Sequence, residues 1–108
     1  MEIHPGVFVS RASEQGWEPD PDVGGEMSLL YQGRGTEAGL SRFSEPCGPI
    51  RWTLPVKETL YVLEGTARVE IAGGPTLELG PGDMASIPGG AATTWHLTTP
   101  FTDFYVLG

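Results

Sequence analysis

Apolar and polar side chains alternate along much of the chain, a pattern typical of β-strands with one buried and one exposed face. Residues 67–71 and 76–79 alternate strictly between apolar positions and polar or charged ones. Glycine and proline interrupt almost every window long enough for three helical turns, so the pattern predicts no helix. The predicted strands cover residues 7–9, 27–31, 37–43, 50–54, 59–64, 67–71, 76–79, 84–87, 93–97 and 101–107.

Turns rich in glycine and proline separate the predicted strands, notably at residues 65–66, 73–75 and 80–83. About ten short strands joined by such turns predict an all-β fold, either an antiparallel sandwich or a barrel, and a jelly-roll barrel suits this length. The 108 residues provide one domain. We expect residues 1–25 to form an N-terminal strand and a loop, and residues 26–108 to form the barrel.

The charge of the chain restricts its partners. Six Lys and Arg residues against 14 Asp and Glu residues give a formal net charge of -8, which would repel nucleic acid and anionic lipid surfaces. No apolar run approaches the roughly 18 residues that a membrane-spanning helix needs. The start of the chain lacks the pattern of a secretory signal and Cys47 is the only cysteine, so we expect a cytoplasmic protein. We also expect a homodimer, because small domains of this kind often cover exposed sheet edges with a second copy.

Two glycine-containing motifs resemble those of the cupin superfamily. Glu58-x6-Gly65 matches the end of the first cupin motif, G-x5-H-x-H-x3,4-E-x6-G. The segment from Gly82 through Pro88 to Gly90 matches the start of the second, G-x5-P-x-G-x2-H-x3-N. Within the superfamily the chain is most similar to the group called ureidoglycine-hydrolase-like or ethanolamine-utilisation-like. The resemblance implies the cupin fold, a double-stranded β-helix that forms an antiparallel jelly-roll barrel.

The resemblance also identifies the positions at which cupins hold a metal ion, and these positions carry unsuitable side chains. The two histidines of the first motif correspond to Trp52 and Leu54, and the histidine of the second corresponds to Thr93. Trp and Leu cannot donate an electron pair to a metal. The chain has two histidines in total, so one chain cannot provide a three-histidine site. We therefore predict no metal and no other cofactor, with an atypical site built from Glu58, His96 and an aspartate as the alternative.

Glu58 is the candidate catalytic residue. The resemblance implies that it faces the barrel interior, where burial would raise its pKa toward neutrality. A carboxyl group with such a pKa suits a general acid or base near pH 7. The alternative is a carboxylate at the barrel mouth that is solvated or paired with Lys57, Arg51 or Arg42.

A set of aromatic, aliphatic and polar side chains is predicted to bind a small-molecule ligand. Trp52 and Trp95 flank the position of the cupin site and offer surface to a flat or apolar molecule. Arg42 and Arg51 either receive a carboxylate or phosphate through paired hydrogen bonds or balance the excess acid in solvent. Tyr61 is predicted to pack in the core. The complete predicted ligand-binding set is Trp52, Leu54, Arg42, Arg51, Thr93, Trp95 and Tyr105.

The residues leave three functional hypotheses. The leading one is a small, metal-independent cupin that binds a small organic molecule in its barrel, with Glu58 available for isomerase, cyclase or lyase chemistry. The first alternative is a non-catalytic module that binds or senses a small molecule, or a structural subunit. The second is a metal-dependent dioxygenase or aminohydrolase with an atypical ligand set.

Overall fold

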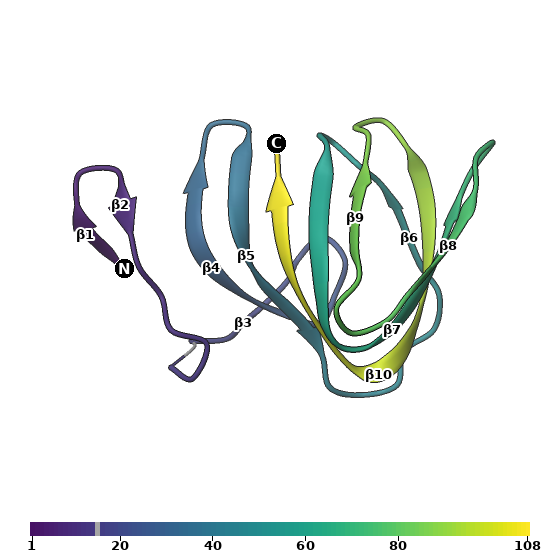
Figure 1. Cartoon of the computed structure of the whole chain (residues 1–108), viewed down its shortest axis with the longest axis horizontal. Coiled ribbons are helices and arrows are strands. Elements are labelled where there is room, and N and C mark those ends of the chain that lie inside the picture. The colour runs from purple at the N-terminus through teal and green to yellow at the C-terminus, as the bar shows by residue number, and fades with distance from the viewer. Residues whose placement is uncertain (15) are drawn as a thin grey trace.

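A computed structural model describes residues 1–14 and 16–108, and every regular element in these residues is a β-strand (Figure 1). The strands are β1 (Glu2–His4), β2 (Val7–Phe8), β3 (Glu18–Pro19), β4 (Glu26–Gly33), β5 (Thr36–Phe43), β6 (Ile50–Thr53), β7 (Glu58–Ile71), β8 (Thr76–Leu79), β9 (Met84–Ile87) and β10 (Ala92–Leu107). The described pairings are antiparallel, which confirms the predicted all-β antiparallel fold. In the part of the chain that the structure describes, no helix is long and apolar enough to cross a membrane.

The strands β7 and β10 form the centre of the barrel. They pair with each other from Thr93 opposite Ile71 to Leu107 opposite Glu58. The C-terminal half of β10 also pairs with β5 and its N-terminal half with β6, while β7 pairs with β9 and β8. Both strands curve sharply near the bottom of Figure 1, so each contributes to both layers of the barrel. This arrangement is the jelly-roll barrel that the sequence predicts.

The structure joins strands that the sequence pattern divides. Residues 59–64 and 67–71 belong to one strand, β7, and residues 93–97 and 101–107 belong to β10. Gly65 explains the difference, because it adopts a φ of 78° that favours glycine. A Cβ atom at this position would overlap backbone carbonyl oxygens of β10. The glycine therefore lets the pairing of β7 with β10 continue through an irregularity instead of ending there.

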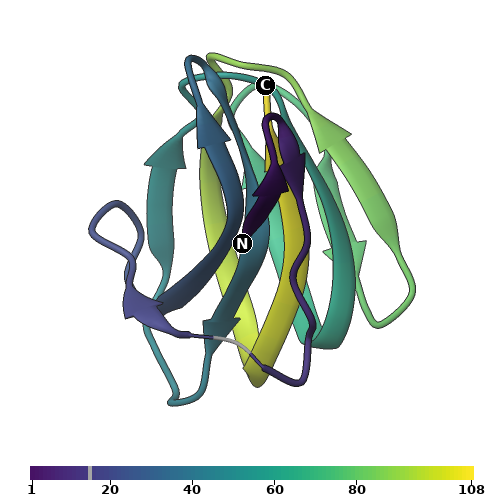
Figure 2. The ribbon, with the colours of Figure 1, turned by 90° about the vertical axis from the view of Figure 1, so that its left-hand side faces the viewer.

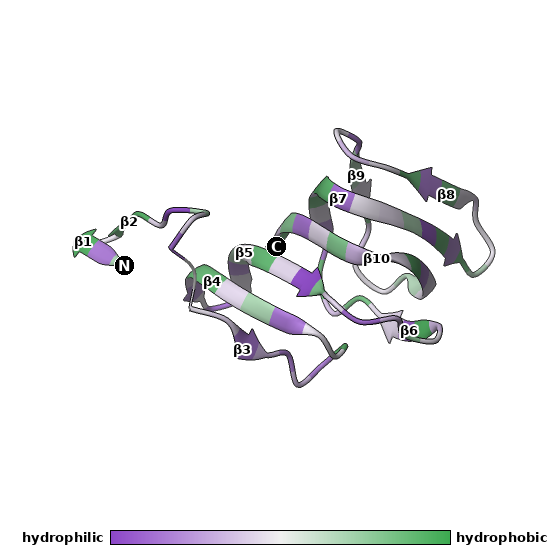
Figure 3. Ribbon diagram, turned by 90° about the horizontal axis from the view of Figure 1, so that it is seen from below, coloured by the Kyte–Doolittle hydropathy of each residue, from purple (hydrophilic) through white to green (hydrophobic). Residues whose placement is uncertain are grey.

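Alternation along the long strands points every second side chain into the barrel. In β7, Leu60, Val62 and Val69 are buried, and Phe101 is buried in β10. Figure 3 shows the alternation as bands of hydrophobic and hydrophilic colour along the strands. Burial of each such side chain contributes about 1.5–3 kcal/mol. Tyr61 is 39% exposed, so its predicted place in the core is wrong; it follows Leu60 and therefore points outward.

The N-terminal hairpin lies beside the barrel and does not join its sheet. The strands β1 and β2 pair only with each other among the described residues, and the hairpin projects on the side of β4 (Figures 1 and 2). The ring of Phe8 lies 6.1 Å from the ring of Tyr31, measured between centroids. Met1 and Ile3 expose their apolar side chains. Residues 18–19, predicted as loop, instead form β3 at the edge of the sheet, a position that tolerates a proline.

Candidate functional site at the barrel mouth

One end of the barrel contains a small cavity of about 130 Å³. Trp52 of β6, Glu58 of β7 and Tyr105 of β10 contribute to its wall, and residues 20–23, between β3 and β4, complete part of it. Its volume equals that of about four water molecules in the liquid. The cavity therefore suits a ligand of only a few heavy atoms.

Glu58 is a buried acid in this cavity. It begins β7 opposite Leu107 of β10 and Ile87 of β9, and it is only 6% exposed. Its Oε1 atom is buried and has no hydrogen-bond partner among the described residues. Burial, with a smaller effect from the charge of Asp103, raises the pKa of Glu58 from 4.5 to about 8. The carboxyl group is therefore mainly protonated at neutral pH, and the alternative of a solvated or ion-paired Glu58 is wrong.

Asp103 is a second buried acid, which the sequence analysis did not single out. It lies in β10 opposite Val62 of β7 and Ser41 of β5, and it is 4% exposed. Its Oδ1 atom has no hydrogen-bond partner among the described residues, and burial raises its pKa from 3.8 to about 7. The signal was present in the sequence, because strand alternation gives Asp103 the same inward direction as Phe101 and Tyr105.

A hydrogen-bonded group fixes the wall of the cavity beside Glu58. The hydroxyl of Tyr105 donates to Glu37 Oε2 at 2.6 Å, and Gln32 Nε2 donates to Glu37 Oε1 at 2.9 Å. Burial, followed by the hydrogen bond to Glu37, raises the pKa of Tyr105 above its ordinary value of 10.0. Tyr105 therefore remains a neutral donor whose proton is already engaged.

Three of the predicted ligand-binding residues support the site without lining this cavity. Leu54 is 1% exposed and belongs to the hydrophobic core. The indole Nε1 of Trp95 donates to Thr93 Oγ1 at 2.8 Å, and the Thr93 hydroxyl donates to the carbonyl oxygen of Trp52 at 2.6 Å. The bond from Thr93 attaches β10 to β6 and so helps to hold Trp52 at the barrel mouth, while the bond from Trp95 lies within β10.

The two predicted arginines lie away from Glu58. Arg42 stacks over the ring of Trp17, 4.0 Å from its centroid, and pairs with Glu26 at 2.9 Å. Arg51 lines a larger cleft, which shares Trp52 with the cavity that contains Glu58. Within the described residues, the structure therefore brings no arginine to that cavity.

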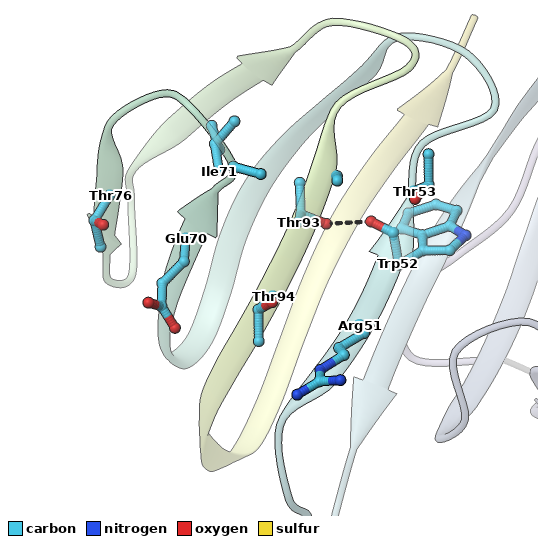
Figure 4. A pocket seen from close by; sticks show the side chains of 10 residues that line it. Arg51, Trp52, Thr53, Glu70, Ile71, Thr76, Thr93 and Thr94 are labelled. Carbon is cyan, nitrogen blue, oxygen red and sulfur yellow. Dashed lines mark hydrogen bonds between the residues drawn. The ribbon is translucent and has the colours of Figure 1, made fainter.

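This larger cleft, of about 560 Å³, lies beside the strands β6, β10, β7 and β8 (Figure 4). Strand pairing places Thr94 between Arg51 and Glu70, as Figure 4 shows. Glu70 binds His96 through a hydrogen bond that lowers the pKa of Glu70, and Arg68 lies 3.9 Å from the same carboxylate oxygen. Among the described residues, buried side-chain atoms without a hydrogen-bond partner belong to Glu58 and Asp103, and neither residue lines this cleft.

The residues at the cupin metal position do not fit a metal ion. Trp52 and Leu54 cannot coordinate one, and the Oγ1 atom of Thr93 is already bonded to Trp52 and Trp95. His96 is bound to Glu70 and follows the buried Trp95, so it points away from the barrel interior. Across the described residues, no three His, Cys, Asp or Glu side chains gather as a potential metal site. The atypical site of Glu58, His96 and an aspartate is therefore wrong.

Comparisons with known proteins agree with the fold. Residues 40–105 match the family model of the EutQ-like cupin domain. A protein assigned as ethanolamine utilization protein Q (EutQ) of Salmonella typhimurium is 24% identical over 99% of this chain and 89% of its own, with a TM-score of 0.79. None of the curated proteins compared with the chain matches it.

Two further solved structures share the barrel at lower identity. An RmlC-like cupin from Shewanella frigidimarina is 18% identical over 91% of this chain and 86% of its own, with a TM-score of 0.73. KdgF from Halomonas sp. is 17% identical over 93% of this chain and 90% of its own, with a TM-score of 0.66. At these identities the likeness concerns the fold, and it agrees with the jelly-roll barrel described above.

Proposed function

Because the chain belongs to the EutQ-like cupin family, we propose that it binds a small organic molecule at the barrel mouth and moves a proton through Glu58 without a metal ion. The observation that carries this proposal is a buried carboxyl group on the cavity wall, with an unpartnered oxygen and a pKa of about 8. A group with such a pKa can both give and accept a proton near neutral pH.

The geometry supports a proton shift within the bound molecule. Glu58, protonated before the ligand binds, delivers its proton to a basic atom of the ligand and becomes a carboxylate. The carboxylate then removes a proton from a neighbouring carbon, which restores the acid and leaves the ligand isomerised. Asp103 does not line the cavity, but its negative charge disfavours ionisation of Glu58 and so helps to keep the proton available.

The donor set supports the metal-independent part of the proposal. Tryptophan and leucine replace the two histidines of the first cupin motif, and the threonine at the third histidine position is engaged in hydrogen bonds. Proton transfer requires only the carboxyl group that remains at this site.

Deuterium exchange tests the proposal without knowledge of the natural substrate. Small carbonyl compounds are incubated with the protein in D₂O, and proton NMR follows loss of the signals from carbons next to the carbonyl. We expect faster exchange with the wild-type protein and a loss of about 100-fold or more in the Glu58→Gln variant, since general acid–base groups contribute 10²–10⁴-fold.

Glu64→Gln is the matched control, because Glu64 lies on the same strand but is exposed. It should exchange at the wild-type rate. Equal exchange by Glu58→Gln and the wild type would reject the role of Glu58. If a compound saturates the mouth of the barrel but returns without deuterium or other change, the non-catalytic binding module is the better description.

A further inference from the structure

The described charged side chains that line the barrel-mouth cavity are all acidic. Glu37, Asp20 and Asp22 line it together with Glu58, and no Lys, Arg or His of the described residues does. The hydroxyl of Tyr105 and one amide N–H of Gln32, which also line the cavity, both donate to Glu37. An entering anion would therefore meet like charges on this wall, where the remaining side-chain donors are neutral: the indole N–H of Trp52 and the second amide N–H of Gln32.

The unpartnered oxygen of Glu58 is an independent sign of a missing donor. This oxygen is shielded from solvent, and Glu58, which lines the cavity, is 94% buried. A buried acceptor without a donor costs free energy, which a ligand recovers if it brings an N–H group to that atom. The carboxyl group offers this acceptor oxygen whether it is ionised or protonated.

We propose that the ligand of this cavity is a small organic cation with N–H donors, of the primary alkylammonium class, whose ammonium group contacts Glu58. This inference rests on the proposed function, because it names the class of molecule that the same site receives. An ammonium group has no basic atom, so the atom that accepts the proton of Glu58 in the proposed reaction belongs to another group of the same ligand.

The chemistry of an ammonium group matches the wall of the cavity. An ammonium carries three donors and no acceptor, whereas Glu58, Glu37, Asp20 and Asp22 supply carboxyl oxygens. The ring of Trp52, on the same wall, attracts a nearby cation and gives apolar surface to its alkyl chain. The volume of about 130 Å³ accommodates a short alkyl chain.

Three compounds of similar shape test the charge preference. Propylammonium, 1-propanol and propionate are titrated in the same buffer into the nitrogen-15-labelled full-length protein, and the indole N–H signal of Trp52 reports binding by NMR. We expect propylammonium to bind with a dissociation constant on the order of 1 mM, since so few atoms limit the affinity. Propanol should bind about tenfold more weakly, and propionate should produce no shift.

Two variants locate the effect in the cavity. Glu58→Gln places amide N–H donors against the ammonium group and should weaken propylammonium binding about tenfold or more. Glu64→Gln makes the same replacement at an exposed position of β7 and should bind propylammonium like the wild type. Retained dispersion in the NMR spectrum of each variant shows that it is folded.

The outcomes separate this inference from the proposed function. If propanol or propionate binds as tightly as propylammonium, and Glu58→Gln weakens that binding, the cation preference is wrong while the ligand site stands. If none of the three compounds shifts the Trp52 signal, the cation preference is wrong and the barrel mouth loses its support as a binding site. If propylammonium binds Glu58→Gln and the wild type equally, the assignment to Glu58 is wrong.

Discussion

Replacement of Glu58 by Gln should make the folded protein more stable at neutral and alkaline pH. The side chain of Glu58 is buried, and its pKa is raised from 4.5 to about 8. Below pH 4.5 the group is protonated in both the folded and the unfolded chain, so it adds no penalty. Between about 4.5 and 8 the unfolded chain loses the proton while the folded chain retains it, and stability therefore falls as the pH rises.

The structure sets the size of this effect. At about 1.4 kcal/mol for each pH unit, the rise of the Glu58 pKa corresponds to a loss of at most about 5 kcal/mol above pH 8 and about 3 kcal/mol at pH 7. The glutamine side chain has a similar shape and no such titration. The two proteins should have similar stability near pH 4, and the variant should be increasingly more stable as the pH rises to 8. Asp103 is present in both proteins, so most of its own contribution cancels in the comparison.

Urea unfolding followed by tryptophan fluorescence measures this difference directly. The free energy of unfolding is determined for the wild type, Glu58→Gln and the exposed control Glu64→Gln at several pH values from about 4 to 9. The control should follow the wild type. Parallel curves for the wild type and Glu58→Gln would refute the reasoning, because they would show that Glu58 ionises as easily in the folded chain as in the unfolded one.

Two further measurements test the metal and partner expectations. Elemental mass spectrometry of protein purified without a tag or chelator should find well under one metal ion per chain, and EDTA should leave the melting temperature unchanged; one ion per chain would contradict the proposal. We also propose a homodimer, because Met1 and Ile3 of the hairpin and Met84 of the barrel expose apolar side chains. Light scattering should give twice the chain mass of 11.5 kDa, whereas a monomer at all concentrations would contradict this.

Most of the fold was predictable because local chemistry determines it. Alternation identified the buried faces, and glycine and proline marked the turns between strands. The continuity of β7 and β10 was not predictable in the same way. Gly65 is a residue type that favours turns, so the sequence predicted a turn there. In the structure the backbone of β10 lies close to Gly65, and the pairing of β7 with β10 continues past it with an irregular register. The local pattern of apolar, polar and glycine residues does not predict such a contact between distant parts of the chain.

The candidate site was predictable where strand alternation or a motif fixes direction. Glu58 was identified from its motif position, and its burial and raised pKa agree with that prediction. Arg51 and Trp52 are adjacent in β6 and both line the larger cleft, but of the two only Trp52 also lines the cavity that contains Glu58, and the sequence pattern does not separate these two pockets. Likewise, the loop of residues 20–23 reaches the cavity through the path of the chain, and no periodic pattern predicts that approach.

The side chains at the cupin histidine positions are consistent with the raised pKa of Glu58. In the cupin motif, a glutamate lies among histidines that hold a cation, and a cation favours the ionised carboxylate. Here the histidine positions carry Trp52 and Leu54, of which Trp52 shares the cavity wall with Glu58 and Leu54 lies in the core. Burial then disfavours the charge without compensation, so the carboxyl group retains its proton near pH 7. The side chains at the cupin histidine positions and the raised pKa of Glu58 therefore agree with the metal-independent proton transfer that we propose.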